Sequence, residues 1–248
     1  MEILVAEPFD DPEDGFGIQQ AVLEEVAAGE RGPVALMWTS SRYVGATRQE
    51  TRLAGFEAAT RAASDLGFPV LVRNSGGGAV AANCGSLSFS LTFPVEDLRH
   101  GLYERYSEGL DLMASSLSRV GVDAERGEVE GEFCPGAYSV RSGGPGGVKH
   151  AGLAQRVTRR AARLEALVLV SETAEIQTVL ERFYGLLELP FRPESVGDLQ
   201  VDVPQVIRAL SEEVRVRYEA AEGRIGAKTM ERARSLRGEW RVTPDTRS

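Results

Sequence analysis

The segment Leu87-Ser-Phe-Ser-Leu-Thr-Phe93 alternates apolar and small polar residues, and this period of two is typical of a half-buried β-strand. A second apolar run, Pro69-Val-Leu-Val-Arg73, precedes it, and the glycine-rich segment 74–80 lies between the two. Strands that follow each other without a helix do not fit a purely parallel sheet, whose strands are joined by helical crossovers. This part of the sequence therefore indicates a sheet with mixed strand directions.

The rest of the chain places helices and further strands around this segment. Amphipathic spacing that ends near glycines predicts helices, and short apolar runs predict strands. The expected helices cover 16–27, 51–66, 98–120, 173–187, 204–219 and 220–238, with an acidic turn at 10–15; the expected strands cover 1–6, 34–38, 43–46, 164–170 and short segments near 128 and 137–140. We expect an α/β (α+β) fold with a mixed β-sheet flanked by helices. Residues 1–200 form its main domain, and 201–248 form an arginine-rich helical extension packed on it.

Length and charge exclude several classes of protein. The chain has 248 residues, with 28 Lys+Arg against 37 Asp+Glu and a net charge of −9. A chain of this length buries a core without disulfides or metals, and a net-acidic domain lacks the electrostatic attraction that holds nucleic acid. No apolar run is long enough to span a bilayer, and the acidic N-terminus is unlike a secretion signal. We therefore expect a cytoplasmic protein that binds neither nucleic acid nor membrane.

Cysteine, histidine and lysine are rare, which narrows the choice of reactive groups. The cysteines, Cys84 and Cys134, are expected to be free thiols in a cytosolic protein. His100, expected at the surface, and His150 are equally scattered, so the spacing predicts no metal site. Lysine occurs only at positions 149 and 228, although the chain has 28 cationic residues. Since arginine does not replace the compact ammonium group, Lys149 is a candidate for a site that needs one; a surface lysine is the alternative.

The glycine-rich loop is the first segment that could carry chemistry. In Arg73-Asn-Ser-Gly-Gly-Gly-Ala-Val80 three successive glycines let a ligand lie against the backbone, with amide N–H groups directed at it. The loop is neither a P-loop nor a dinucleotide fingerprint, because no Gly-Lys-Ser/Thr follows and the next element is a strand. A tight connection between two strands is the alternative interpretation.

A cysteine on a turn is the second such segment. Cys134 lies in Gly131-Glu-Phe-Cys-Pro-Gly-Ala-Tyr138, where Pro and Gly hold the thiol out of regular structure. A structural cysteine usually lies inside an apolar strand or helix. Cys84, in Asn83-Cys-Gly-Ser86, is also on a turn, so position alone does not choose between the two cysteines.

The third segment, Val148-Lys-His-Ala-Gly-Leu-Ala-Gln-Arg156, surrounds Lys149 with small residues that permit close approach of a substrate. Arg159, Arg160 and Arg163 follow it and form a local cationic patch on an acidic protein. This patch is either a solvated face or a docking surface for an acidic protein partner.

Four segments in this order resemble those of the biotin/lipoate protein ligase and transferase family. They are Arg73-Asn-Ser-Gly-Gly-Gly-Ala-Val80, Gly85-Ser-Leu-Ser-Phe-Ser90, Cys134-Pro-Gly-Ala-Tyr138 and Lys149-His-Ala-Gly-Leu-Ala-Gln-Arg156. Within the family, Cys-Pro-Gly followed by Lys-x-Ala-Gly-x-x-Gln-Arg looks most like the octanoyl-[glycine-cleavage H protein]:protein N-octanoyltransferases, the lipoyl amidotransferases. The resemblance extends from residue 34 to residue 199.

This resemblance implies an acyltransferase catalytic domain over 1–200, with the acyl chain in a tunnel beside the glycine loop. It implies that Cys134 is the nucleophile that carries the acyl group and that Lys149 hydrogen-bonds the acyl carbonyl. The residues it implies for substrate binding are Arg73, Ser75, Gly76, Gly77, Gly78, Ala79, Gly152, Ala154 and Gln155. No metal or cofactor is implied. The implied partners are an acylated carrier protein, the glycine-cleavage H protein, and acceptor lipoyl domains.

Such chemistry fits the residues present. Exchange of one amide for another through a Cys134 thioester is nearly isoergic, so no ATP is required. The ammonium of Lys149 would stabilise the tetrahedral oxyanion, an effect of about 3 kcal/mol for one donor, and would favour thiolate over thiol. In an extended segment His150 would point to the opposite face from Lys149.

Three alternatives stay open at this point. An ATP-dependent lipoate–protein ligase would use Lys149 to bind an acyl-adenylate and would not need Cys134. A transferase that takes octanoyl from acyl carrier protein would keep the thiol but use a thioester donor. A non-catalytic module would recognise lipoyl domains through the cationic patch and form no acyl-enzyme.

Overall fold

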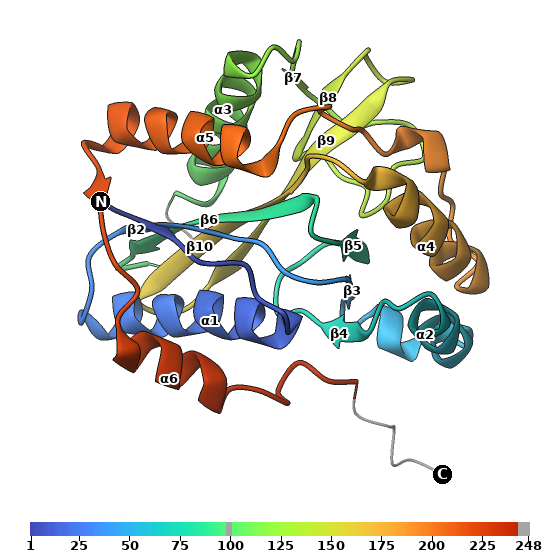
Figure 1. The fold of residues 1–248 in the computed structure, drawn as a ribbon, viewed down its shortest axis with the longest axis horizontal. Coiled ribbons are helices and arrows are strands. Elements are labelled where there is room, and N and C mark those ends of the chain that lie inside the picture. The colour runs from blue at the N-terminus through green and yellow to red at the C-terminus, as the bar shows by residue number, and fades with distance from the viewer. Residues whose placement is uncertain (98–100, 243–248) are drawn as a thin grey trace.

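A mixed eight-stranded sheet forms the centre of the computed structural model, which describes residues 1–97 and 101–242 (Figure 1). Its strands, in spatial order, are β11 (Ala221–Glu222), β1 (Glu2–Val5), β2 (Val34–Trp38), β6 (Ser86–Pro94), β10 (Ala161–Leu169), β9 (Val148–Val157), β8 (Ser139–Ser142) and β7 (Glu125–Arg126). Strands β11, β1 and β2 run parallel, and every pair from β2 to β7 is antiparallel. The expected mixed sheet flanked by helices is confirmed.

The alternating segment that indicated this fold is the central strand β6. It pairs with β2 on one side and along its whole length with β10 on the other. Leu87, Phe89 and Leu91 face one side and belong to a single buried core cluster. The intervening serines are also buried, since helices cover both faces of the sheet.

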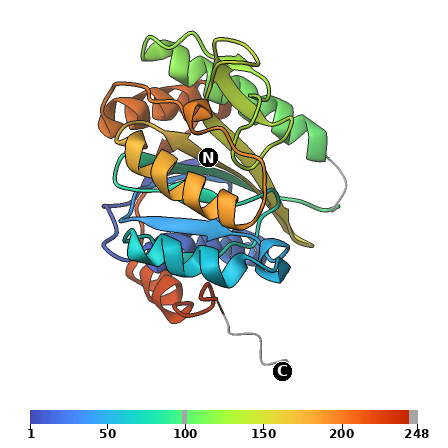
Figure 2. The ribbon, with the colours of Figure 1, turned by 90° about the vertical axis from the view of Figure 1, so that its right-hand side faces the viewer.

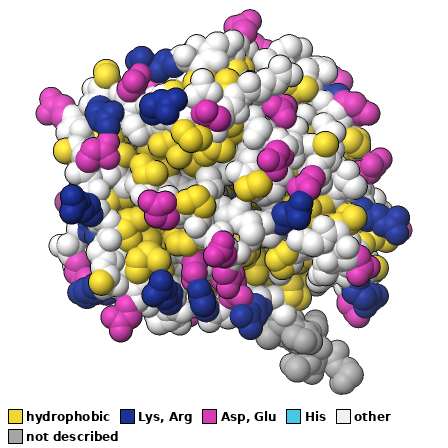
Figure 3. Space-filling view, in the orientation of Figure 1, with side chains coloured by type: hydrophobic (Ala, Val, Ile, Leu, Met, Phe, Trp, Pro, Cys, Tyr) yellow, Lys and Arg dark blue, Asp and Glu magenta, His cyan; other side chains and the backbone are white. Residues whose placement is uncertain are grey.

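Helices lie on both faces of the large sheet (Figures 1 and 2). On one side α1 (Pro12–Ala28) packs against β6 and β10, and α6 (Ala227–Ser235) packs against α1. On the other side α3 (Leu102–Arg119) contacts β8 and β9, and α5 (Val203–Tyr218) packs along α3. On the face shown in Figure 3, acidic and basic side chains are interspersed over the surface.

A small second sheet holds the glycine-rich loop. Its order is β4 (Val70–Val72), β3 (Tyr43–Ala46) and β5 (Val80–Ala82), and the loop connects β4 to β5. The helices α2 (Phe56–Asp65) and α4 (Thr173–Leu186) pack against each other and against this sheet. The remaining elements are two one-turn helices, η1 (Glu50–Arg52) and η2 (Pro193–Ser195). The loop is therefore anchored at both ends by buried strands.

Several local expectations differ from the structure. The acidic segment 10–15 is not only a turn, because Asp11 caps α1 through Glu13 N and the helix begins at Pro12. Residues 148–157 form the ten-residue strand β9, which the sequence did not predict because Ala and Gly have low β-propensity. Residues 220–226 are not helical: they contain β11, which extends the sheet beside β1. The expectations for Leu98 and His100 lie outside the described residues.

No helix in residues 1–97 and 101–242 has both the length and the apolar composition needed to cross a bilayer.

Candidate active site

Cys134 lies on the loop between β7 and β8, with its sulfur directed at the glycine-rich loop. The residue has a positive φ of 46°, which is unusual for a side chain with a Cβ and is typical of sharp turns. The N–H of Gly78 lies 3.1 Å from Sγ, and Nη2 of Arg73 lies 3.4 Å from it. Two hydrogen-bond donors from one loop therefore converge on a sulfur from another loop.

Arg73 is held in this position by the glycine-rich loop itself. Its Nη2 donates to Gly78 O at 2.8 Å, and its Nη1 donates to Ser75 Oγ at 2.9 Å. Arg73 is buried, and Glu165 lies 3.8 Å from its Nη1. The guanidinium thus bridges the cysteine and a carboxylate on β10.

The hydroxyl of Tyr184, on α4, ties the two loops together. It accepts from Cys134 N at 2.7 Å and donates to Ala79 O at 2.8 Å. The phenol is buried, and this burial raises the pKa of Tyr184. Ala79 N donates to the carboxylate of Glu50 at 2.6 Å. The backbone N–H and C=O of Ala79 are therefore both hydrogen-bonded to other side chains of the protein.

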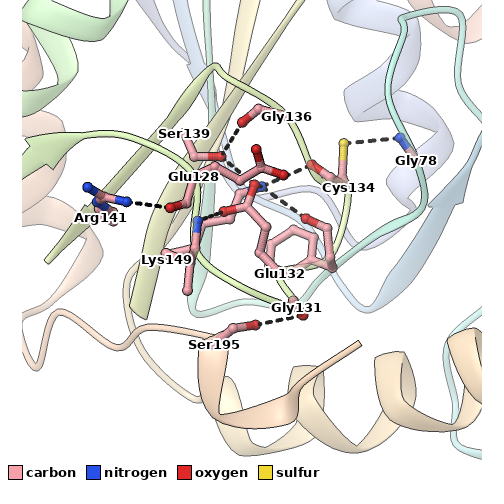
Figure 4. A network of polar contacts seen from close by, with 12 residues as sticks. Gly78, Glu128, Gly131, Glu132, Cys134, Gly136, Ser139, Arg141, Lys149 and Ser195 are labelled. Carbon is pink, nitrogen blue, oxygen red and sulfur yellow. Dashed lines mark hydrogen bonds and ion pairs between the residues drawn. The ribbon is translucent and has the colours of Figure 1, made fainter. Parts of the chain in front are cut away.

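Lys149 lies behind the cysteine loop in a buried polar network (Figure 4). Its Nζ donates to Glu132 Oε1 at 2.9 Å, to Phe133 O at 3.0 Å and to Cys134 O at 3.2 Å. The side chains of Lys149 and Glu132 are 1% and 0% exposed. Glu132 also accepts from Ser139 Oγ at 2.6 Å and from a backbone N–H. All three ammonium donors are therefore engaged, and the charge is fixed close to the cysteine carbonyl.

A cavity of about 320 Å³ opens beside Cys134 and Lys149. Its wall is mainly apolar, and the aromatic rings in it are Phe16, Trp38, Tyr43, Tyr106, Phe133 and Tyr138. Tyr106 and Tyr138 stack with ring centroids 3.5 Å apart, and burial raises the pKa of Tyr106 to about 12. A volume and lining of this kind suit a small apolar ligand.

One carboxylate, that of Glu165, interrupts this apolar wall. Burial acts to raise the pKa of Glu165, but the guanidinium groups of Arg163 and Arg73 outweigh it and lower the pKa. Nε of Arg163 donates to Glu165 at 2.8 Å, and Gln19 donates to the same carboxylate. The carboxylate is therefore ionised and fully engaged by neighbouring side chains.

The structure brings together most of the residues expected at the site. Cys134, Lys149, Arg73, Gly76, Gly77, Gly152 and Ala154 all line the cavity. Gly78 contributes its amide to the sulfur, and Ser75 supports Arg73. Ala79 and Gln155 do not line the cavity. Ala79 is fully buried, and the Gln155 side chain is hydrogen-bonded to Arg105 and to Leu102 O on α3.

His150 and Cys84 lie away from the cavity lining. His150 is buried on the opposite side of β9, with Nε2 2.8 Å from Ser142 Oγ, and burial lowers its pKa to about 4. Cys84 is exposed, and its thiol donates to Glu172, which raises the pKa of Cys84. Cys84 and Cys134 are both free thiols.

The prediction of a cationic patch at Arg159, Arg160 and Arg163 is wrong for Arg163. Arg163 is buried, because β10 turns it inward to pair with Glu165. Arg159 and Arg160 are exposed at the turn between β9 and β10. Two exposed arginines remain from that patch.

Sequence reasoning missed Glu132 and Tyr184. Glu132 offered one signal, since it is an acidic residue two positions before the cysteine. Tyr184 offered none, because it is 50 residues from Cys134 and reaches it only through the packing of α4. Among residues 1–97 and 101–242, no cluster of three His, Cys, Asp or Glu side chains is suited to hold a metal ion.

Comparison with known proteins connects this geometry to a family. Residues 11–217 match the model of the lipoyl protein ligase A/B catalytic domain. A Geobacillus kaustophilus protein named octanoyl-[GcvH]:protein N-octanoyltransferase is 32% identical over 207 residues, which are 83% of this chain and 71% of that protein. A protein of the same name from Bacillus velezensis is 29% identical over 210 residues, which are 84% of this chain and 72% of that protein.

Solved structures show the same fold at lower sequence identity. Lipoate-protein ligase A bound with ATP superposes with a TM-score of 0.77 at 20% identity, covering 95% of this chain and 93% of that one. Protein Ta0514 from T. acidophilum with bound lipoic acid superposes with a TM-score of 0.73 at 20% identity, with the same coverage.

Proposed function

Because the chain belongs to the lipoyl protein ligase A/B catalytic domain family and is an acyltransferase, we propose that it transfers an octanoyl group through a thioester on Cys134. The donor is an octanoylated carrier protein, the glycine-cleavage H protein, and the acceptor is the target lysine of a lipoyl domain. The names of the Geobacillus and Bacillus relatives support this donor.

One observation carries the proposal: the sulfur of Cys134 lies at an apolar cavity and has two donors within 3.4 Å. The alkyl tail occupies the cavity, and its carbonyl carbon lies next to the sulfur. The thiolate attacks the carbonyl carbon of the donor amide and forms the carbon–sulfur bond. The carbon–nitrogen bond then breaks, and the lysine nitrogen of the carrier takes a proton from solvent and leaves as an amine. The acceptor amine then attacks the thioester and restores an amide, so the two steps together need no ATP.

Lys149 supports both steps as a buried positive charge. Its longest hydrogen bond, 3.2 Å, goes to the carbonyl of Cys134 itself. Exchange of this bond for one to the substrate oxyanion would keep the ammonium fully bonded while charge develops on the substrate. Glu132 and Phe133 O hold the ammonium in place during the exchange.

Intact-mass measurement of the protein after incubation with octanoyl-H protein, without ATP, tests this function. We expect an octanoyl adduct that Cys134→Ala abolishes and Cys84→Ala retains. Incubation with octanoyl-acyl carrier protein in parallel identifies the donor: adduct formation from that protein alone would replace the H protein in the proposal.

Two outcomes would reject the acyl-enzyme. Acceptor modification that appears only with ATP and persists in Cys134→Ala would assign the protein to the ligases. Lipoyl-domain binding without any adduct, lost on arginine substitution, would indicate a non-catalytic module. The cytoplasmic location and the division into 1–200 and 201–248 stay predictions.

A further inference from the structure

A second cavity lies at the glycine-rich loop and shares Arg73, Gly76 and Gly77 with the first. It has a volume of about 510 Å³, and the charged residues in its wall are Arg48, Arg73 and Arg156. The rest of its wall is polar or glycine, and no acidic residue of the described chain lines it. We name this cavity the arginine groove.

The arginine groove adjoins the apolar cavity that contains the reactive sulfur. Arg73, Gly76 and Gly77 line both this groove and the apolar cavity. A Cβ added to Gly77 would lie 2.5 Å from Cys134 Sγ and 2.9 Å from Arg73 Nη2, so the backbone of this glycine lies directly against the sulfur. The groove is therefore a polar hollow separated from the sulfur by little more than the Gly77 backbone and the Arg73 side chain.

Arg156 brings an incompletely satisfied charge to the groove. Its Nη1 donates to Asn74 O at 2.9 Å, but its Nε is buried without a hydrogen-bond partner. Burial lowers the pKa of Arg156, and the guanidinium of Arg163 lowers it further. Arg48 is exposed at the rim and also acts electrostatically on Arg156.

The acidic groups near the groove do not line it, although Glu165 lies 3.8 Å from Arg73, and Glu165 and Glu24 act electrostatically on Arg156. Glu165, on β10, pairs with Arg163 and accepts from Gln19. Glu50, on η1, accepts from the backbone of Thr47 and Ala79. Glu24, on α1, accepts from Gln20. The wall of the groove therefore holds three guanidinium groups, of which Arg73 is paired with Glu165.

We propose that the acceptor's lysine reaches the thioester through the arginine groove, whose guanidinium groups favour the neutral, nucleophilic form of its amine. Like charges close to an amine disfavour its protonation and so activate it as a nucleophile. The proposal rests on the Cys134 acyl-enzyme described above. The lysine loses a proton to solvent and its nitrogen attacks the carbonyl carbon. The carbon–sulfur electron pair then leaves with Cys134 as thiolate, and the second nitrogen proton goes to solvent.

The test is single-turnover deacylation of isolated octanoyl-enzyme by Nα-acetyl-lysine methylamide, followed by intact mass across a pH series. We expect Arg156→Gln to shift the rise of the deacylation rate by about one pH unit towards higher pH, since one nearby cationic charge is lost. Arg48→Gln should shift it in the same direction. Arg156→Lys keeps the charge but not the fork-shaped guanidinium, and should keep the profile near that of the unmodified protein.

Two controls isolate the electrostatic effect. Hydroxylamine is already neutral at pH 7, so its deacylation rate should not respond to Arg156→Gln. Arg208→Gln removes an exposed charge from α5, outside the groove lining, and should leave the profile in place.

The outcomes separate this inference from the acyl-enzyme itself. If octanoyl-enzyme forms but Arg156→Gln leaves the lysine profile unshifted, the inference is overturned and the proposed function stands. Equal slowing by Arg156→Gln and Arg156→Lys would also overturn it, because the hydrogen bond to Asn74 O and not the charge would then be responsible. If no octanoyl adduct forms on Cys134, the proposed function is rejected, and the inference that rests on it is rejected as well.

Discussion

The backbone N–H of Gly78 lies 3.1 Å from the sulfur of Cys134, although 56 residues separate the two in sequence. The donor comes from the loop between β4 and β5, and the sulfur comes from the loop between β7 and β8. The Tyr184 hydroxyl is hydrogen-bonded to both loops and holds them against each other. The environment of the thiol is therefore produced by contact between two loops and not by the turn that carries the cysteine.

A methyl group at Gly77 should block this contact. Gly77 has a φ of +100°, and its added Cβ would lie 2.5 Å from Cys134 Sγ. Gly77→Ala should therefore reduce formation of the octanoyl adduct by at least about a hundredfold, because the backbone and the nucleophile must both move. Gly76→Ala is the matched comparison, since its added Cβ meets nothing within 4 Å. Equal rates for the two variants by intact mass would contradict the geometry.

Replacement of Arg73 should lower the reactivity of the cysteine. In a Cys84→Ser background, alkylation of Cys134 by iodoacetamide reports on that thiol alone. Arg73→Gln should slow alkylation at pH 7 by about tenfold, because a charge-assisted hydrogen bond to the sulfur is worth about 1.5 kcal/mol or more. Arg73→Lys should show a smaller loss, since the charge stays but the fork does not. An unchanged alkylation rate in Arg73→Gln would show that Gly78 N is the donor that matters.

Substitutions in the buried ion pair of Lys149 and Glu132 should affect the stability of the protein and its acylation rate differently. Glu132→Gln leaves the ammonium unpaired in a buried site and should cost about 3–5 kcal/mol of unfolding free energy in urea titrations. The double variant Glu132→Gln/Lys149→Met should recover part of this loss, because no buried charge is left alone. It should still form the octanoyl adduct at least about a hundredfold more slowly, as should Lys149→Ala, since the oxyanion loses its ammonium donor. Adduct formation at the normal rate in the double variant would remove Lys149 from the mechanism.

Burial of neutral His150 should make the protein acid-sensitive. Burial lowers the pKa of His150 from 6.5 to about 4, and Asp198 opposes this only in part. A histidine whose pKa is depressed in the folded state binds its proton more readily when unfolded. Stability is therefore full above pH 6.5 and is lost as pH falls towards 4, by up to about 3 kcal/mol.

Urea titrations at pH 7.5 and pH 4.5 test this dependence. His150→Gln removes the titrating group and keeps a polar side chain beside Ser142. The difference in unfolding free energy between the two pH values should be smaller in this variant than in the unmodified protein. An equal difference would show that other groups cause the acid sensitivity.

Part of the fold was readable from local pattern. The alternation in Leu87–Phe93 marks the central strand, and the helices at 173–186 and 203–218 follow amphipathic spacing with little deviation. β9 was not readable, because its small residues leave room for the apolar cavity and weaken the strand signal at the same time. Residues 220–226 were mistaken for helix, since the pairing of β11 with β1 depends on a strand at the opposite end of the chain.

The sequence by itself determined the mixed sheet and the reactive groups of this protein, a thiol on a turn, a rare lysine and a glycine-rich loop, because periodicity and side-chain chemistry are local properties. Only the tertiary structure decided which groups meet. It places Arg73 and Gly78 at the sulfur, uses Tyr184 to join the loops, pairs Lys149 with Glu132, and turns Gln155 towards α3. These contacts join residues from different elements, and their distances depend on the packing of strands and helices that are far apart in the chain.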